Sequence, residues 1–362
     1  MKNKIFKRFV DSRSRSALPS GRRLSLESLE TREMLNADWS GFDVEQVTTY
    51  RPEQGSGYTV DLVGTTDQCE MVDLNGDGRD EIVTLDFSTK TLNVYSVASN
   101  TYTLKSTQKL SSLSGSKGYD SVLINNDSLT VVSASTGVGL TVTEYTWNPT
   151  ISSYIQKSQS ELDVSKFNAS NADFCLFVDV SATLIDGSMV VQATTLTLTG
   201  TTDTTVRYTG YGTSSFGTES AVLSSIREDL MGTTTINGKD YLILKETTSS
   251  SNNLVLASLS GRTVEKYTYD LSCYGGSLVV SWVVEQDGFL VVGAQTGGTS
   301  GIITIKSTTP QADLDVSTLG QWVPSASLKF NSSCHAAIGN AGGDSDPEIF
   351  VVNGSTHMFY FG

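Results

Sequence analysis

Residues 71–87 read MVDLNGDGRDEIVTLDF, and this stretch decides the fold that the sequence predicts. Two short apolar runs flank an acidic, glycine-rich turn, which is the pattern of two strands joined by a tight loop. Gly76 and Gly78 let the backbone curl, because glycine reaches positive φ without steric cost. The stretch therefore predicts a strand at residues 70–73, an acidic turn, and a second strand at residues 81–86.

The combination of a turn and an apolar strand recurs along the rest of the chain. Equivalent strand residues are spaced by 48, 59, 53, 48 and 59 positions. They are Ile82, Thr130, Met189, Leu242, Leu290 and Ile349. A period near fifty residues, without sustained helical periodicity, is typical of propeller blades of four strands each.

Counting these units predicts an all-β, six-bladed β-propeller. The first unit divides into strands at 70–73, 81–86, 92–97 and 102–109, whereas the last has only three, at 335–338, 348–352 and 358–361. An isolated strand at 42–49 is expected to supply the missing fourth strand and to close the ring, which removes exposed sheet edges. Seven blades and a pair of β-sandwiches are the alternatives.

The acidic turn carries the donor set of a calcium site. Calcium takes six to eight oxygen ligands from carboxylates, amides and carbonyls. Asp73, Asn75 and Asp77 offer side-chain oxygens at alternating positions, Arg79 its carbonyl, and Glu81 a closing carboxylate. Strands flank the turn, and the glutamate comes at the ninth loop position, so an EF-hand is excluded.

The segment MVDLNGDGRDEIVTLDF resembles the FG-GAP/VCBS repeat of integrin-like propellers. This resemblance implies Ca²⁺ in the loop joining the first two strands of a blade. Glu81 departs from the family, in which Asp is usual at that position. The last unit, NAGGDSDPEIF at 340–350, has the same frame, but Gly342 stands where a ligand is expected, which leaves a second ion at Asp344 in doubt.

The first 37 residues differ in charge from the rest of the chain. They hold 9 Lys/Arg and 4 Asp/Glu, and the remaining residues hold 16 and 35. Residues 24–38 also resemble the LExLExRxML segment of planctomycete-type exported bacterial proteins. The matching positions are Leu26, Glu27, Leu29, Glu30, Arg32, Met34 and Leu35. We expect residues 1–37 to be an export leader, disordered or removed, and residues 38–362 to be an extracellular or cell-surface propeller domain.

The sequence favours a binding module over an enzyme. It has two histidines, His335 and His357, and no GxSxG elbow, HExxH helix or P-loop. The acidic body argues against nucleic acid as a partner, and no apolar run of membrane-spanning length exists. We therefore expect an adhesion or scaffold protein for a protein or polysaccharide ligand. The alternative is a carbohydrate-active lyase or hydrolase, indicated by two carboxylates with Arg or Lys in the central channel.

Two further sets of residues have alternative interpretations. The four cysteines are Cys69, Cys175, Cys273 and Cys334. Cys69 and Cys334 precede first strands of neighbouring blades and are predicted to form a disulfide, the alternative being buried thiols. Five aromatic residues form either a ligand-binding face or packing between blades: Tyr145, Trp147, Trp282, Trp322 and Tyr360.

Overall fold

The computed structural model describes most of the chain after residue 64. The described residues are 65–98, 101–116, 118–135, 139–167, 176–197, 200–217, 220–246, 253–260, 263–275, 278–286, 288–310, 317, 319–325, 334–341, 348–353 and 356–360. The predicted leader at 1–37 and the predicted closing strand at 42–49 lie outside them.

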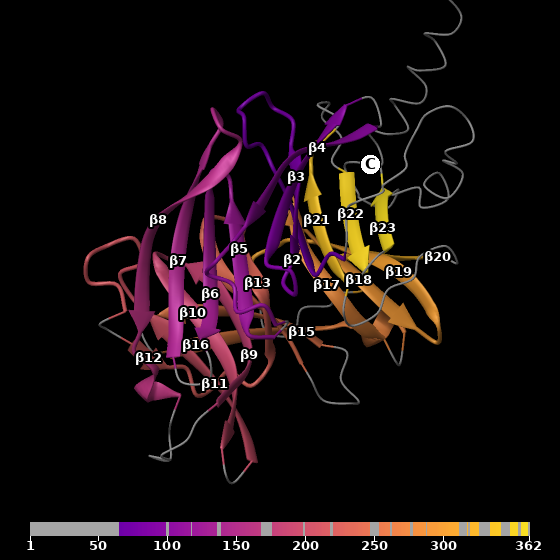
Figure 1. Cartoon of the computed structure of the whole chain (residues 1–362). Helices are drawn as coiled ribbons and strands as arrows, with labels where there is room; N and C mark the ends of the chain where they lie inside the picture. Colours follow the sequence, from indigo (N-terminus) through magenta and orange to yellow (C-terminus); the bar gives the residue numbers. More distant parts are fainter. Residues whose placement is uncertain are drawn as a thin grey trace, which may run out of the picture. The chain divides into compact units, whose positions relative to one another are not determined.

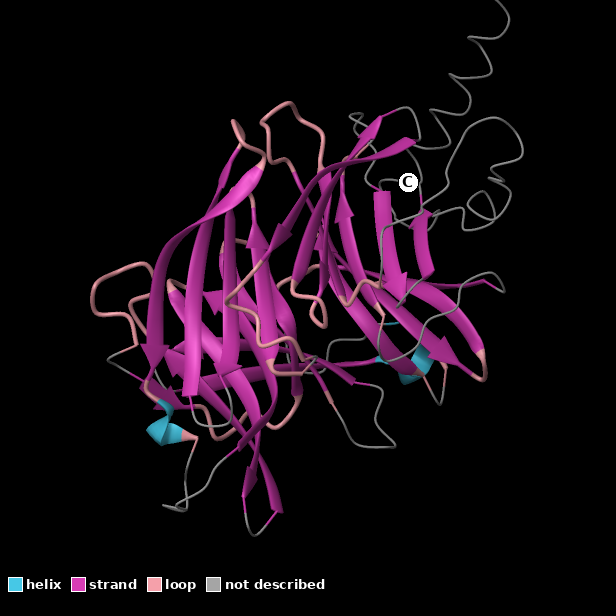
Figure 2. Ribbon diagram, in the orientation of Figure 1, coloured by secondary structure: helices cyan, strands magenta, loops and turns pink. Residues whose placement is uncertain are grey.

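The described chain is an all-β propeller (Figures 1 and 2). Consecutive antiparallel strands form each sheet, because short polar turns join apolar runs of similar length. The first sheet contains β1 (Gln68–Val72), β2 (Glu81–Asp86), β3 (Thr91–Ala98) and β4 (Thr101–Lys109). The second contains β5 (Asp120–Asn125), β6 (Ser128–Ser135), β7 (Gly139–Asn148) and β8 (Ser153–Leu162).

Three further sheets repeat this four-stranded plan. The third contains β9 (Leu176–Ile185), β10 (Ser188–Thr197), β11 (Gly200–Tyr208) and β12 (Ser220–Val222). The fourth contains β13 (Asp229–Ile236), β14 (Lys239–Lys245), β15 (Asn253–Ser260) and β16 (Thr263–Asp270). The fifth contains β17 (Val279–Gln286), β18 (Phe289–Thr296), β19 (Thr299–Lys306) and β20 (Gly320–Ser325). Short 3-10 helices follow β8 and β16, at Val164–Lys166 and Leu271–Tyr274.

The expected count of six blades is corrected to five among the described residues. The last sheet has three described strands, β21 (His335–Gly339), β22 (Glu348–Asn353) and β23 (Thr356–Tyr360). Strand β1 contacts β21, and β21 contacts β17, so the three-stranded sheet lies between the fifth blade and the first. Its fourth strand was predicted from residues outside the described ones.

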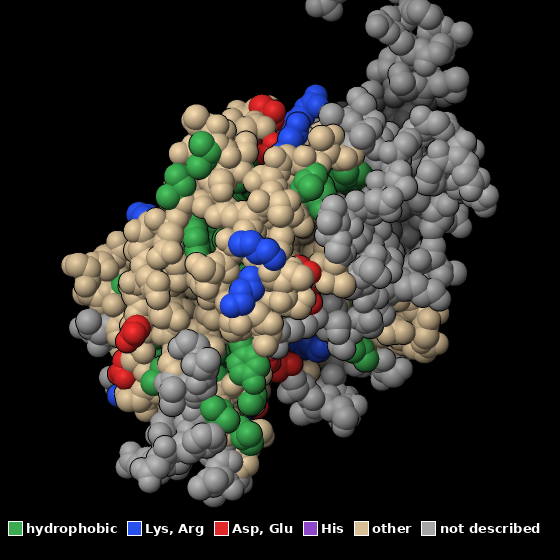
Figure 3. Space-filling view, viewed as in Figure 1, with side chains coloured by type: hydrophobic (Ala, Val, Ile, Leu, Met, Phe, Trp, Pro, Cys, Tyr) green, Lys and Arg blue, Asp and Glu red, His purple; other side chains and the backbone are tan. Residues whose placement is uncertain are grey.

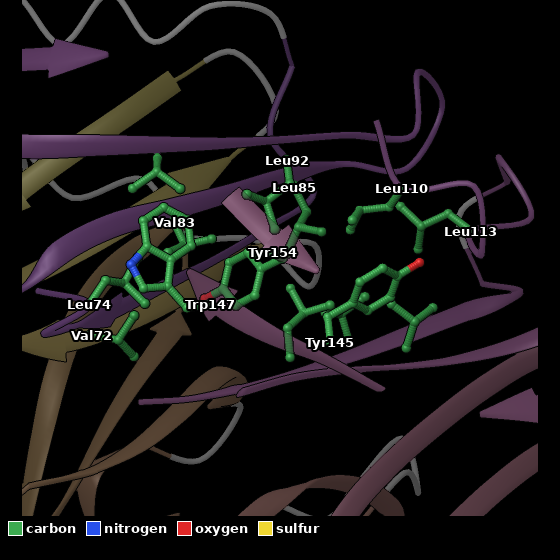
Figure 4. Close-up of a cluster of buried hydrophobic side chains, with 14 of the residues drawn as sticks. Val72, Leu74, Val83, Leu85, Leu92, Leu110, Leu113, Tyr145, Trp147 and Tyr154 are labelled. Atoms are coloured by element: carbon green, nitrogen blue, oxygen red, sulfur yellow. The ribbon is translucent and has the colours of Figure 1, made fainter. Parts of the chain in front are cut away.

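Apolar side chains pack between successive sheets. Separate buried clusters join the first sheet to the second, the second to the third, the third to the fourth, the fourth to the fifth, and the last to the first. Figure 4 shows the cluster between the first two sheets, where Leu74 and Val72 lie beside the ring of Trp147. Burial of both sheet faces explains why β2 is buried along its whole length. No helix in the described part of the chain has the length and apolarity needed to cross a membrane.

Candidate functional site

The acidic turn predicted to bind calcium joins β1 to β2. Its residues from Asn75 to Arg79 are exposed, whereas Leu74 is buried and belongs to the core between the first two sheets. Gly76 and Gly78 have φ values of 75° and 82°, the left-handed region that glycine tolerates. The turn is therefore fixed at its base by packing, and its tip lies in solvent.

Side-chain oxygens inside the turn accept backbone N–H groups. Asp73 Oδ1 accepts from Gly76 N at 2.7 Å and from Asp77 N at 3.2 Å, and Asp73 Oδ2 accepts from Gly78 N at 2.9 Å. Asn75 Oδ1 accepts from Asp77 N and Asp77 Oδ1 from Arg79 N, each at 2.9 Å. Because these hydrogen bonds wrap the backbone around its own side chains, Asp73, Asn75 and Asp77 are brought to one turn.

Glu81 lies at the base of the turn and is buried. Its Oε2 accepts from Leu74 N at 2.9 Å, and its Oε1 accepts from Asn75 Nδ2 at 2.6 Å. Burial raises the pKa of the Glu81 carboxyl, and the charges of Asp77 and Asp73 raise it further. The three carboxylates therefore repel one another across the turn, a repulsion that a bound cation would relieve.

The oxygen-only donors of Asp73, Asn75 and Asp77 fit a hard cation such as calcium. Within the described residues, no group of three or more His, Cys, Asp or Glu side chains is arranged to hold a metal ion. This is consistent with the position of Glu81, whose carboxylate is hydrogen-bonded to the backbone of the turn. The interaction described for Arg79 is the hydrogen bond that its backbone N–H donates to Asp77 Oδ1.

The last sheet contains a hydrogen bond equivalent to the one at the base of this turn. Glu348, the first residue of β22, accepts a hydrogen bond at 2.9 Å from the backbone N–H of Ala341, seven residues earlier. Glu81 and Leu74 have the same separation and the same bond. Both glutamates and both partner residues are buried. The tip of the second turn, including Gly342 and Asp344, lies outside the described residues.

Asp80 connects the acidic turn to the last sheet, a role that sequence analysis missed. Its backbone N–H donates to the Asn340 carbonyl at 2.8 Å, and its Oδ2 accepts from the Asn340 N–H. Burial raises the pKa of Asp80, and the charge of Asp73 adds to this shift. Nothing local in the sequence identifies Asn340 as the partner, because the two residues are 260 positions apart.

A second acidic site lies between the third and fourth blades. A cavity of about 100 Å³ is lined by Asp179 on β9, Asp203 on β11, Asp229 on β13, and Arg227. Burial raises the pKa values of Asp179 and Asp229, and the charge of Asp203 raises both further. Gln192 joins the two blades beside this cavity, donating to Glu228 O at 2.6 Å and accepting from Leu230 N at 2.7 Å. Carboxylates on the first strands of two blades thus lie near one arginine.

The predicted disulfide between Cys69 and Cys334 is wrong, and the alternative of buried thiols holds for these two residues. Cys69 and Cys334 are both buried, and no disulfide joins them. The Cys69 thiol points to the Phe350 carbonyl oxygen at 3.8 Å, in the core shared by the first and last sheets. His335 follows Cys334 as the first residue of β21. The side chain of His357 lies outside the described ones, as does Cys175.

Three of the five singled-out aromatic residues pack in the interior. Tyr145, Trp147 and Trp282 are 5%, 9% and 3% exposed, so they do not form a ligand-binding face. Trp147 meets Tyr154 edge-on, with ring centroids 5.1 Å apart. Trp322 is partly buried against the core of the fourth and fifth blades, and the side chain of Tyr360 lies outside the described ones.

No protein-family model matches the chain. No curated protein matches it either. Among solved structures, the major allergen Mala s 1 of Malassezia sympodialis is 10% identical, with 82% of this chain and 94% of that one covered and a TM-score of 0.49. A subtype N10 neuraminidase-like protein from a little yellow-shouldered bat isolate is 10% identical, covering 83% and 93%, with a TM-score of 0.47. The SapL1 lectin, solved with alpha methyl fucoside, is 9% identical, covering 83% and 97%, with a TM-score of 0.40. Similarity at this level does not bear on function.

Proposed function

We propose that this chain is an exported, calcium-binding β-propeller of the FG-GAP/VCBS type. It acts as an adhesion or scaffold module for a protein or polysaccharide at the cell surface, and not as an enzyme. The observation that carries the proposal is the arrangement of Asp73, Asn75 and Asp77 around one turn whose base is fixed in the core. Their oxygens belong to the ligand types that calcium prefers.

Calcium in this proposal has a structural role. Asp73, Asn75 and Asp77 would supply side-chain oxygens, Arg79 its carbonyl, and Glu81 a carboxylate once it leaves Leu74 N. Because Asp80 ends the same turn and bonds to Asn340, an ordered turn also supports the contact between the first and last sheets. The cation would thus stabilise the neighbouring loops to which a ligand binds.

Residues 42–49 complete the last sheet in this proposal. Strand β23 is the outermost described strand of a three-stranded sheet, and a fourth strand beside it would complete that sheet and close the ring. The basic segment at 1–37 serves as the export leader. Mass spectrometry of the secreted protein should find residues 1–37 removed, and an intact leader on extracellular protein would contradict this step.

Binding of the full chain to arrays of glycans and secreted proteins tests the function. We expect a ligand that binds in millimolar calcium and binds more weakly in chelator. Asp77→Ala should weaken binding in calcium to the level of the wild type in chelator. Absence of binding to every glycan and protein tested would refute the adhesion role.

The cavity lined by Asp179 and Asp229 supports a second candidate, a polysaccharide hydrolase or lyase. Two carboxylates with raised pKa values beside Arg227 are the feature expected of such an enzyme. Release of new reducing ends from a polysaccharide, abolished by both Asp179→Asn and Asp229→Asn, would favour it. Equal release by the wild type and both variants would exclude this cavity as the active site.

A further inference from the structure

An open groove lies between the first and second blades, away from the acidic turn. Its volume is about 340 Å³, within the range of ligand-binding clefts. One wall is the surface of the second sheet, and the other is the segment linking β4 to β5 together with Lys90. Its lining is composed mainly of hydroxyl and amide side chains. Figure 3 shows that uncharged polar side chains and backbone also dominate the described part of the face in view.

On the surface of the second sheet that borders this groove, the side chains change from apolar to polar. Val131 and Tyr145 belong to the apolar core. Thr143 is opposite both Val131 on β6 and Gln159 on β8, and Thr141 is opposite Ser133, so these polar side chains share one face. The apolar surface therefore gives way to hydroxyl and amide groups where the groove opens.

Two of these hydroxyl-bearing residues are buried apart from the surface where they border the groove. Thr143 and Ser133 are 1% and 3% exposed, and both line the groove. A ligand in the groove that accepts and donates hydrogen bonds matches these hydroxyl groups. Ser112 is similarly placed, since its Oγ accepts from Tyr145 Oη at 2.8 Å and keeps its own proton to donate.

Lys90 supplies the one charge among the lining residues. It has a left-handed backbone with φ of 56°, and it forms no ion pair with the described residues. Its stem lies close to Gly115, where an added Cβ would come within 2.8 Å of Lys90 Cε. The ammonium group is therefore held at the groove without a neutralising carboxylate, in a protein whose net charge is −14.

We infer that this groove binds an acidic oligosaccharide, with a uronate carboxylate at Lys90 and sugar hydroxyls at Ser112, Ser133 and Thr143. The inference rests on the proposed function as a binding module and names its ligand class. Sugar hydroxyls both donate and accept, which matches a lining of hydroxyl and amide groups. A peptide is disfavoured because it needs apolar anchors, and the apolar lining residue Leu113 is only 1% exposed.

Calorimetric titration of the full chain tests the inference with three probes: oligogalacturonate, its methyl ester, and a neutral glucose oligomer. We expect binding of the acid, with affinity reduced about tenfold for the ester because the charge-assisted hydrogen bond to Lys90 is lost. Lys90→Gln should weaken binding of the acid by a similar factor. Lys157→Gln, which removes the same charge from an exposed position on β8 outside the groove, should bind like the wild type.

Thr143→Val separates binding from folding. It replaces a hydroxyl group at the groove with a methyl group of similar size, so the melting temperature should change little while binding of the acid weakens. Thr146→Val, on the same strand outside the groove, is the matched control. Equal affinity of the wild type and Lys90→Gln for the acid would overturn the inference, as would binding of poly-glutamate as tightly as the oligogalacturonate. If the array finds a calcium-dependent ligand that Lys90→Gln binds normally, the proposed function stands and the groove is not its site.

Discussion

Asp80 and Asn340 hold each other through a backbone and a side-chain hydrogen bond across the junction of the first and last sheets. The space between them is small, because a Cβ added at Gly339 would come within 2.8 Å of Met71 Cβ and would overlap the Asp80 carboxylate. The same aspartate follows directly on the acidic turn. The turn proposed to bind calcium and the junction between the two ends of the propeller are therefore one structural unit.

Asp80→Ala should lower the free energy of unfolding by about 1–3 kcal/mol, because the Asn340 N–H loses its acceptor in a partly buried site. Urea unfolding in chelator, followed by circular dichroism, measures this change without any contribution from metal binding. Asp77→Ala is the control, since Asp77 is exposed, and it should change stability by no more than about 0.5 kcal/mol. Equal stability of both variants would mean that the Asp80–Asn340 pair does not support the junction.

Glu70 on β1 should make stability depend on pH. Burial, followed by the charge of Asp80, raises the pKa of its carboxyl to about 8. The folded state therefore keeps a proton that the unfolded state releases near pH 4.5. Its contribution to stability is present below that pH and is lost as pH rises through about 8.

Glu70→Gln, which is neutral at every pH, should remove this dependence. Urea unfolding from pH 5 to 8.5 should show the wild type losing more stability than the variant, with the difference growing toward the alkaline end. Glu161→Gln, at an exposed position on β8, should follow the wild type. Parallel curves for the wild type and Glu70→Gln would show that Glu70 is ionised throughout this range.

The repeat predicted the strands closely because each strand is defined by local signals. The predicted strand at 81–86 coincides with β2, and the predicted strands at 102–109 and 348–352 differ from β4 and β22 by one residue. The outer strand of the fifth blade has a weak sequence signal, because β20 contains Pro324 and few apolar residues, and it pairs along one edge with β19. Its backbone pairing with β19, which runs from Gly320 opposite Ile305 to Ser325 opposite Ser300, places it in the sheet.

Relations between distant blades could not be predicted from the sequence. Asp179 and Asp229 belong to different blades, and only the packing of those blades brings them to one cavity. The predicted disulfide failed for the same reason: similar positions in two repeats do not fix where the Cys69 thiol points, and it faces Phe350. The acidic turn was recognised because its residues are adjacent in the sequence. The sequence did not show that the Glu81 carboxylate accepts a hydrogen bond from Leu74 N at the base of the turn.

Gly293 on β18 should not tolerate a larger residue. It is opposite Trp282, and a Cβ at this position would lie 2.0 Å from Trp282 Cε2. Gly293→Ala must therefore displace the buried indole, which should cost about 1–3 kcal/mol of stability. Combining it with Trp282→Leu should recover part of the loss, because the smaller side chain leaves room for the methyl group. Urea unfolding of both single variants and the double variant measures the coupling, and strictly additive losses would contradict this packing.

The last prediction concerns the cation. If the turn at Asp73–Glu81 binds calcium, the ion stabilises the folded state by mass action, by about 2.7 kcal/mol when free calcium is a hundred times the dissociation constant. Because a domain of this size shifts by about 2–4 °C per kcal/mol, the melting temperature should rise by several degrees between chelator and millimolar calcium. Asp77→Ala removes a ligand from the exposed tip and should abolish the rise. Asp344→Ala changes the turn of the last sheet, where Gly342 replaces an expected ligand, and should leave the rise almost intact. Identical melting temperatures of the wild type in the two buffers would leave the turn as a solvated acidic loop, held by its own hydrogen bonds and by the packing of Leu74.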